Sequence, residues 1–425
     1  MARLKHQLPQ IKEILPLMKF KAPTLDRRAA RLAAVGNVWD IRKIAKRRTP
    51  TPAFDYVDGA AQSETTLNRS RKLFNEIELI PKILHSTPEV DLSTTIAGGP
   101  SSLPFGIAPT GFTRFMHSEG EDAGAASAAK AGIPFSLSTM GTRSIEEVAQ
   151  ASEKSKNSKD GSGRRWFQLY LWKDREASRD LLERAQNEGF DTLLVTVDTP
   201  VAGQRLRDVR NGMTIPPQLT AKTVLDASYR PEWWFNFLTT DPLTFASLTN
   251  TASDLPTLIN AMFDPSLSIE DLEWIRSIWP GRLLVKGILT AEDTRRALDA
   301  GADGLIVSNH GGRQLDRSPV SIQALTEVRK EAGPGVEIIL DSGVMSGSDI
   351  VAALGLGADF VIIGRAYLYG LMAGGEEGVD KVIDLLAEEV RNAMLLMGTR
   401  TIEDLKNSGQ VIAPWLKNDN ENIDA

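Results

Sequence analysis

Eight short apolar segments, separated by charged Ala- and Leu-rich segments, predict an α/β protein built as a closed (β/α)8 TIM barrel. Each apolar segment is hydrophobic almost throughout, which is typical of parallel strands buried on both faces. The intervening segments end in Gly, as helices with a C-terminal cap do. Eight repeats of this unit are the sequence form of the barrel. The expected strands occupy residues 105–109, 134–138, 166–170, 192–198, 283–287, 304–309, 337–341 and 360–364.

Similar sequences at the ends of the units support repetition of one structural element. Residues 300–307 read AGADGLIV, residues 356–363 read LGADFVII, and residues 189–195 read GFDTLLV. An open doubly wound sheet is the alternative fold, but it would carry a glycine-rich dinucleotide fingerprint at its first turn. No such fingerprint follows residues 105–109.

The barrel is expected within a domain over residues 36–405, between an N-terminal helical extension (1–35) and a C-terminal tail (406–425). The repeat is interrupted once, between the fourth and fifth strands. Part of that interval fits a helix at residues 269–279, and residues 200–265 form an insertion at the catalytic end of the barrel. Loops of this length are usually functional or disordered.

The composition is that of a soluble globular protein and excludes several classes of chemistry. The 425 residues include 42% hydrophobic and 24% charged residues, and the formal net charge is −6, without the basic excess of nucleic-acid-binding proteins. The absence of Cys excludes disulfides, zinc–thiolate sites, iron–sulfur clusters and thiol nucleophiles. No apolar run is long enough to span a bilayer and no secretory signal is visible, so a cytoplasmic protein is expected.

Two segments suit either a membrane surface or packing on the protein itself. Residues 1–35 are basic, with apolar residues at helical spacing from Leu4 to Met18, and packing on the own domain is the favoured interpretation. The insertion carries an aromatic group at residues 233–237, which suits a membrane interface and the barrel mouth about equally.

Polar side chains follow almost every predicted strand, at the end where barrels of this type carry out chemistry. After the sixth strand, a turn with two adjacent glycines presents a base and a cation. A base with arginines and a phenol suits a small anionic substrate that loses a proton, and an Asp would orient the base. These candidate residues are Tyr170, Asp198, Arg205, His310 and Arg313.

The ends of strands seven and eight indicate a phosphate site. Asp341-Ser342-Gly343 and Gly364-Arg365 stand where this fold commonly binds phosphate through backbone N–H groups and a helix N-terminus. Alone, this site also allows an isomerase or aldolase acting on a sugar phosphate. A non-catalytic binding protein is disfavoured, because it would give His310 and Asp198 no reason to converge.

Several motifs resemble the FMN-dependent enzymes that oxidise 2-hydroxy acids, the family of glycolate oxidase, mandelate dehydrogenase and L-lactate dehydrogenase. The resemblance covers about residues 36–405 and looks strongest toward bacterial quinone-linked L-lactate dehydrogenases. It rests on the active-site signature at residues 308–316 and on shorter matches in the same order at residues 54–56, 107–110, 167–170, 196–200, 284–287 and 364–365.

The resemblance implies FMN as cofactor and a role for each residue. His310 is implied to be the base, paired with Asp198. The substrate residues are implied to be Tyr56, Met140, Tyr170, Arg205 and Arg313, and Lys286 is implied to stabilise the anionic reduced flavin. The FMN site is implied to comprise Ala108, Pro109, Thr110, Ser138, Gln168, Thr196, Lys286, Ser308, Asp341, Ser342, Gly343, Gly364 and Arg365.

The implied activity is oxidation of L-lactate, or a related (S)-2-hydroxy acid, with quinone as electron acceptor. The alternative is a soluble oxidase that uses oxygen and releases hydrogen peroxide. Gly111 stands where family oxidases often carry Ala, which favours the dehydrogenase, and a quinone acceptor would place the protein peripherally on the inner face of the cell membrane. The resemblance also implies a homotetramer. Met345 replaces an Arg that the family often uses at the phosphate, which predicts weaker FMN binding.

Overall fold

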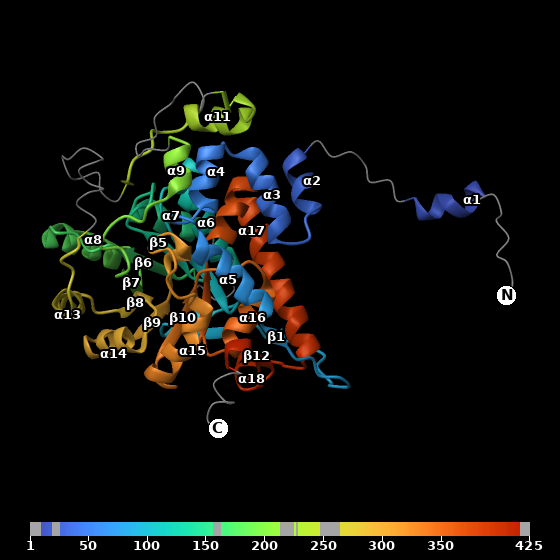
Figure 1. The fold of residues 1–425 in the computed structure, drawn as a ribbon. Helices are drawn as coiled ribbons and strands as arrows, with labels where there is room; N and C mark the ends of the chain where they lie inside the picture. Colours follow the sequence, from blue (N-terminus) through green and yellow to red (C-terminus); the bar gives the residue numbers. More distant parts are fainter. Residues whose placement is uncertain are drawn as a thin grey trace.

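The computed structural model describes residues 10–18, 26–155, 163–212, 225–226, 228–246 and 264–416. Eight parallel strands close into a barrel in chain order, with the last strand paired to the first (Figure 1). The predicted barrel is therefore confirmed, and the open sheet is excluded. Its strands are β4 (Phe105–Thr110), β5 (Phe135–Ser138), β6 (Arg165–Leu169), β7 (Thr192–Thr196), β8 (Arg282–Ile288), β9 (Gly304–Val307), β10 (Glu337–Asp341) and β11 (Phe360–Ile363).

The barrel interior is filled by a separate cluster of buried side chains, which explains the continuous apolar strand sequences. Alternate residues point inward, and the others pack against the surrounding helices. Ile96 and Ala97, beside the hairpin of β2 (Thr94–Ile96) and β3 (Gly99–Ser101), belong to this interior cluster. The barrel members of the cluster are Ala108, Trp166, Leu194, Leu284, Ile306, Ile339, Phe360 and Ile362.

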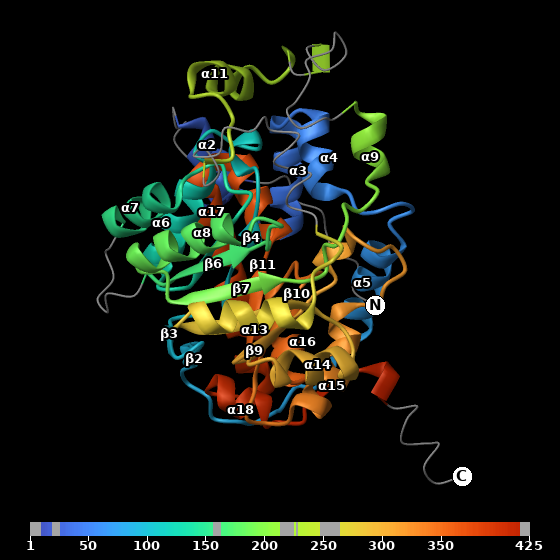
Figure 2. The same ribbon diagram turned by 90° about the vertical axis from the view of Figure 1, so that its left-hand side faces the viewer.

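Helices follow the strands and cover the outside of the barrel (Figure 2). Several begin with side-chain caps: Ser144 and Glu147 form a capping box at one helix, and Asp174 caps the next. The predicted helix at residues 269–279 is α13 (Ile269–Ile278). The others are α6 (Gly120–Ala131), α7 (Ile145–Lys154), α8 (Arg175–Asn187), α14 (Ala291–Asp299), α15 (Ser321–Ala332), α16 (Gly347–Gly355) and α17 (Arg365–Met397).

After residue 26, four helices precede the barrel, and three of them contribute to its carboxyl-terminal end. They are α2 (Arg27–Ala33), α3 (Val38–Arg48), α4 (Thr51–Asp58) and α5 (Thr65–Glu76), and α3 packs along α17. Pro50 is the N-cap residue of α4 and Pro52 is its second residue, positions where proline is tolerated at the start of a helix. These helices bring the chain before the barrel next to the strand ends.

The first described segment does not pack on the domain, so the packing prediction is wrong for it. Helix α1 (Ile11–Ile14) and the turn Leu15–Leu17 lie away from the body (Figure 1). Ile11, Leu15 and Met18 are 74%, 61% and 47% exposed. The apolar residues at this spacing do lie on helical turns, but no surface among the described residues covers their side chains. Leu4 and Leu8 lie outside the described residues.

The described parts of the insertion include α9 (Leu206–Arg210) and α11 (Pro231–Thr239). On α11 the packing interpretation is confirmed for part of the aromatic group, and membrane contact of the exposed part stays a prediction. Trp233 donates its indole N–H to the Phe115 carbonyl oxygen at 3.1 Å and stacks on Phe237, whereas Phe235 and Leu238 are 68% and 69% exposed.

After α17 the chain forms α18 (Ile402–Lys406), and β12 (Val411–Ile412) then pairs with β1 (Glu78–Leu79). The described part of the predicted tail therefore returns to the body of the protein. Within the described ranges, no helix has the length and apolar character needed to cross a membrane.

Candidate active site

A cavity of about 460 Å³ opens at the carboxyl ends of the strands, which is a volume typical of cofactor sites. Its walls come from the strand ends, from α3, α4 and α5, and from the start of the insertion. Most residues predicted from the sequence line it. These are Tyr56, Ala108, Pro109, Thr110, Ser138, Met140, Tyr170, Arg205, Lys286, His310, Arg313, Asp341, Ser342, Gly343, Gly364 and Arg365.

Four predicted residues lie behind the cavity wall: Gln168, Thr196, Asp198 and Ser308. Gln168 accepts a hydrogen bond from the hydroxyl of Ser138 at 2.9 Å and donates one to Thr196 Oγ1 at 2.9 Å. These buried side chains fix the orientation of groups that face the cavity, because each of the four makes at least one hydrogen bond or ion pair, although Asp198 Oδ2 has no hydrogen-bond partner among the described residues.

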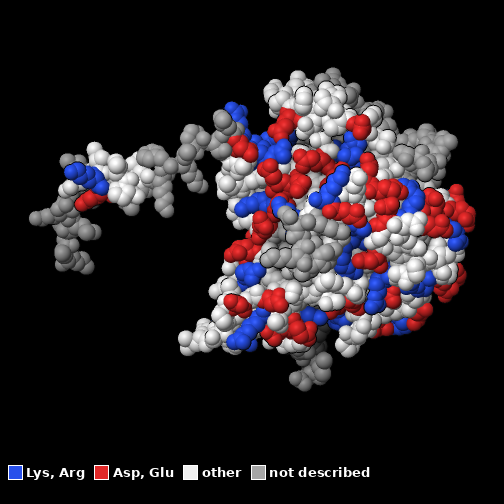
Figure 3. All heavy atoms as spheres, turned by 180° about the vertical axis from the view of Figure 1, so that it is seen from behind, with Lys and Arg blue, Asp and Glu red and all other residues white. Residues whose placement is uncertain are grey.

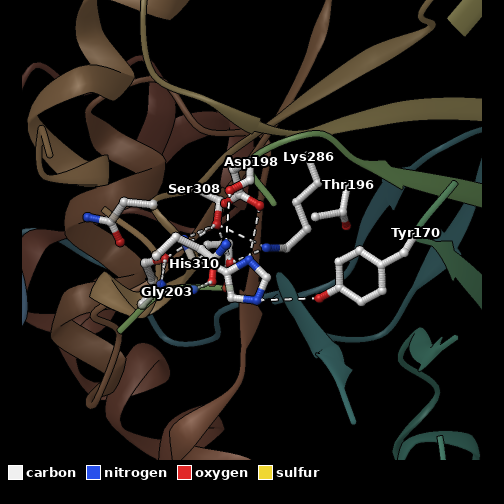
Figure 4. A network of polar contacts seen from close by, with 12 residues as sticks. Tyr170, Thr196, Asp198, Gly203, Lys286, Ser308 and His310 are labelled. Atoms are coloured by element: carbon white, nitrogen blue, oxygen red, sulfur yellow. Dashed lines mark hydrogen bonds and ion pairs between the residues drawn. The ribbon is translucent and has the colours of Figure 1, made fainter. Parts of the chain in front are cut away.

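The predicted base and its predicted carboxylate partner are in contact (Figure 4). His310 Nδ1 lies 3.0 Å from Asp198 Oδ1. His310 reaches this position because its backbone is left-handed (φ 57°) and because Gly311 and Gly312, also left-handed, continue the turn. Burial opposes the charge of Asp198, but His310 and Lys286 outweigh it and lower the pKa of the carboxyl. Asp198 is therefore an anion that can stabilise a protonated His310.

The other ring nitrogen of His310 faces the phenol of Tyr170, with 3.5 Å between Nε2 and the hydroxyl oxygen. Burial, together with the charge of Asp198, raises the pKa of Tyr170. The phenol therefore keeps its proton at neutral pH and is a hydrogen-bond donor at the cavity wall.

Lys286 is a buried cation in the middle of the site. Its ammonium group lies 2.9 Å from Asp341 Oδ2 and donates to Ser308 Oγ at 3.0 Å, and the Ser308 hydroxyl donates to the same Asp341 oxygen at 2.6 Å. Burial disfavours the charge, but Asp341 and Asp198 overcome this and raise the pKa of Lys286. The site therefore contains a permanent positive charge beside the strand ends.

Two guanidinium groups flank the ring of Tyr56, with Arg313 and Arg205 at 4.9 and 5.1 Å from its centroid. Arg205 also pairs with Asp208 at 3.3 Å. Burial, followed by the repulsion of Arg205, lowers the pKa of Arg313 to about 10, so it remains charged at neutral pH. Among the described residues, its hydrogen-bond partners are the carbonyl oxygens of Tyr56 and Gly59. Arg205 and Arg313 are thus two adjacent cations, and Asp208 is the carboxylate that pairs with Arg205, so the net positive charge favours a bound anion.

The predicted phosphate end is formed by backbone groups and by Arg365. Ser342 and Gly343 have left-handed backbones, and an added Cβ on Gly364 would have no neighbour closer than 3.9 Å, so the cavity reaches the backbone there. Helix α17 starts at Arg365 and directs its free N–H groups to this end. Met345 also lines the cavity.

Several cavity-lining residues have no role assigned from the sequence, including Arg207, which stands shortly after the fourth predicted strand. They are Arg42, Asp58, Glu64, Arg71, Arg207 and Tyr369, from α3, α4, α5, α9 and α17 and the loop before α5. The one signal for two of them is spacing: Asp58 stands two residues after Tyr56, and Arg207 two residues after Arg205.

Fold and cavity define a (β/α)8 barrel with an anion-binding centre and a phosphate-type cradle. The chain belongs to the FMN-dependent dehydrogenase family, whose model matches residues 45–412. A protein of Mycobacterium tuberculosis, provisionally named an L-lactate dehydrogenase, is 52% identical over 95% of both chains. The L-lactate dehydrogenase of Ectopseudomonas mendocina is 42% identical over 86% of this chain and 96% of its own length.

Solved structures show the same fold. The monotopic membrane protein (S)-mandelate dehydrogenase superposes with a TM-score of 0.83 at 37% identity, over 89% of this chain and 100% of that one. Mandelate oxidase superposes with a TM-score of 0.75 at 34% identity, over 89% and 98% of the two chains.

The residues present fit FMN, the cofactor of this family. The backbone cradle at Gly364 and the charge of Arg365 suit a phosphate, and the Lys286 ammonium suits the negative charge that a flavin ring carries when reduced. The cavity volume of about 460 Å³ is sufficient for a cofactor of this class.

Proposed function

We propose that this protein oxidises an (S)-2-hydroxy acid, with L-lactate as the substrate and pyruvate as the product. The observation that carries the proposal is the His310–Asp198 pair, 3.0 Å apart, at a cavity with two arginines. The names of the relatives support the choice of L-lactate. FMN, when bound, accepts the two electrons that leave the substrate α-carbon.

The proposed roles follow from charge and position. Arg313 and Arg205 bind the carboxylate, since paired guanidinium groups match its planar geometry. Tyr56 and Tyr170 donate hydrogen bonds to the carboxylate and hydroxyl. His310 removes the substrate proton, and Asp198 stabilises the protonated imidazole.

The remaining predicted residues are proposed to hold FMN. The ends of β10 and β11, with Arg365, bind the phosphate, while Lys286 lies at the ring. The rest of the set is Ala108, Pro109, Thr110, Ser138, Gln168, Thr196, Ser308, Asp341, Ser342, Gly343 and Gly364, of which Gln168, Thr196 and Ser308 act from behind the wall.

The substrate side chain is proposed to be short and apolar. Met140 and Ala202, both uncharged, line the cavity, and an added Cβ on Gly111 would lie 2.5 Å from Met140 Cβ. Met140 thus packs directly on the backbone of Gly111 and occupies space that a larger substituent would need. Comparing kcat/KM for L-lactate and (S)-mandelate tests this, and a preference for mandelate would contradict it.

Quinone is the proposed electron acceptor, with peripheral attachment to the inner face of the cell membrane. Exposed apolar residues gather on the insertion and the neighbouring loop at the catalytic end, namely Val201, Val209, Leu225, Tyr229, Phe235, Leu238 and Leu315. Figure 3 shows uncharged surface at the top of the molecule, above a body with interspersed acidic and basic side chains. Similarity to a monotopic membrane protein supports this attachment. The implied homotetramer stays a prediction.

The attachment can be tested with a matched pair of variants. Leu238 on α11 and Leu396 on α17 are each 69% exposed. We expect Leu238→Ser, but not Leu396→Ser, to reduce co-sedimentation with anionic vesicles. We also expect lactate-reduced protein to be reoxidised faster by a soluble quinone than by oxygen. Fast reaction with oxygen without sedimentation would identify a soluble oxidase instead.

A further inference from the structure

A cluster of charged side chains around the buried Asp58 joins the N-terminal helices to the insertion beside the cavity. We call it the Asp58 cluster, comprising Arg42, Asp58, Glu64, Arg207 and Tyr369. Asp58 accepts hydrogen bonds from Arg42 at 2.6 and 2.9 Å, from Arg207 at 2.9 Å and from the Tyr369 hydroxyl at 2.8 Å. Arg207 also donates to Glu64 Oε2 at 2.5 Å.

The cluster is strongly ionised. The Asp58 side chain is 6% exposed, yet Arg42, Tyr369 and Arg207 overcome its burial and lower its pKa. Burial opposes the charge of Arg207, but Glu64 and Asp58 raise its pKa. Without Arg207, Asp58 would keep Arg42 and Tyr369 as partners, but the ion pairs that link Asp58 and Glu64 to α9 would be lost.

Each end of the Asp58–Arg207 pair is two residues from a proposed substrate residue. Tyr56 precedes Asp58 on α4, and Arg205 precedes Arg207 at the start of α9. The backbone reinforces this link, because the Gln62 N–H donates to the Gln204 carbonyl oxygen at 2.7 Å. The pair therefore contributes to the contact of α9 with α4, together with the hydrogen bond from Asn211 to Asp55 at 2.8 Å, and Arg205 lies 5.1 Å from the Tyr56 ring, from guanidinium carbon to ring centroid.

We propose that Arg207 and Asp58 are positioning residues for the substrate carboxylate: their ion pair holds α9 against α4 and so sets the relative position of Arg205 and Tyr56. Arg207 suits this role because its planar fork reaches Asp58 and Glu64 at once, which a lysine ammonium could not do in the same geometry. The inference rests on the proposed function, in which Arg205 and Tyr56 bind the substrate.

The test compares FMN-loaded wild type with Arg207→Gln, Arg207→Lys and a control, Arg184→Gln. Arg184 makes a comparable two-point ion pair with Glu146, at 2.9 and 3.0 Å, between α8 and α7 on the outside of the barrel. The readouts are KM and kcat for L-lactate, and the Kd of oxalate, a carboxylate probe, from the change in flavin absorbance.

We expect Arg207→Gln to raise KM and the oxalate Kd about tenfold while kcat changes about threefold or less. The reason is that a shift of Arg205 and Tyr56 weakens binding of the carboxylate but leaves His310, the proposed base, in place. Arg207→Lys should lie between this variant and wild type, and Arg184→Gln should match wild type.

Unchanged KM and oxalate Kd in the Arg207 variants would overturn the inference, as would equal changes in Arg184→Gln. If Arg207→Gln fails to fold, KM for L-lactate and the Kd of oxalate in Arg207→Lys test the inference instead. If wild type does not turn over L-lactate, the proposed function fails, and the oxalate Kd still tests the positioning role.

Discussion

Replacing Asp198 by Asn should leave the fold and FMN in place and slow the reduction of the flavin by substrate. At the 3.0 Å between Asp198 Oδ1 and His310 Nδ1, an effective dielectric constant of about 20 gives roughly 5 kcal/mol of attraction between unit charges. This upper estimate corresponds to about four factors of ten in rate. Because Asn can still accept a hydrogen bond from the imidazole, we expect a loss on the order of 10²–10⁴.

The assay is stopped-flow flavin reduction by saturating L-lactate without oxygen, with FMN content as the control. A second readout is the stability of the folded protein as the pH is lowered. The pKa of Asp198 is lowered in the folded protein, so its contribution to stability is complete at neutral pH and is lost as pH falls through that folded value. The Asn variant should therefore lose less stability than wild type on acidification. A reduction rate within a factor of about three of wild type would refute the role of this pair.

Three further outcomes follow from the site. His310→Gln should retain FMN and lose flavin reduction by about 10²–10⁴ or more, measured in the same stopped-flow assay. Arg313→Lys should lower turnover far more than FMN content, because an ammonium cannot form a two-point contact with a carboxylate. Loss of flavin with intact turnover per bound flavin would indicate instead that Arg313 binds the cofactor. Met345→Arg should tighten FMN binding but leave riboflavin binding unchanged in fluorescence titrations, because the added cation would reach only the phosphate.

The barrel and its catalytic end could be predicted from the sequence because both are local. Each strand is a continuous apolar segment, and each polar residue at its end is adjacent in the chain. Parallel strands then bring those ends together, which is why Asp198 and His310 meet although 112 positions separate them.

The remaining part of the cavity depends on contacts that no local pattern records. Asp58 lies on α4 before the barrel, and Arg207 lies on the short helix α9 after β7, 149 positions further along the chain. Their pairing is decided by how α4 and α9 pack over the barrel. The aromatic group of the insertion was ambiguous for a related reason: on a short helix, neighbouring residues such as Trp233 and Phe235 face different surroundings.

Oxidation of L-lactate by the FMN-bound protein can be measured by adding L-lactate to the purified protein without oxygen while recording flavin absorbance. We expect a yellow protein whose flavin absorbance is bleached by one equivalent of L-lactate per flavin, with D-lactate inert and pyruvate formed. A colourless protein, or a flavin that stays oxidised with L-lactate and other short (S)-2-hydroxy acids, would contradict this expectation.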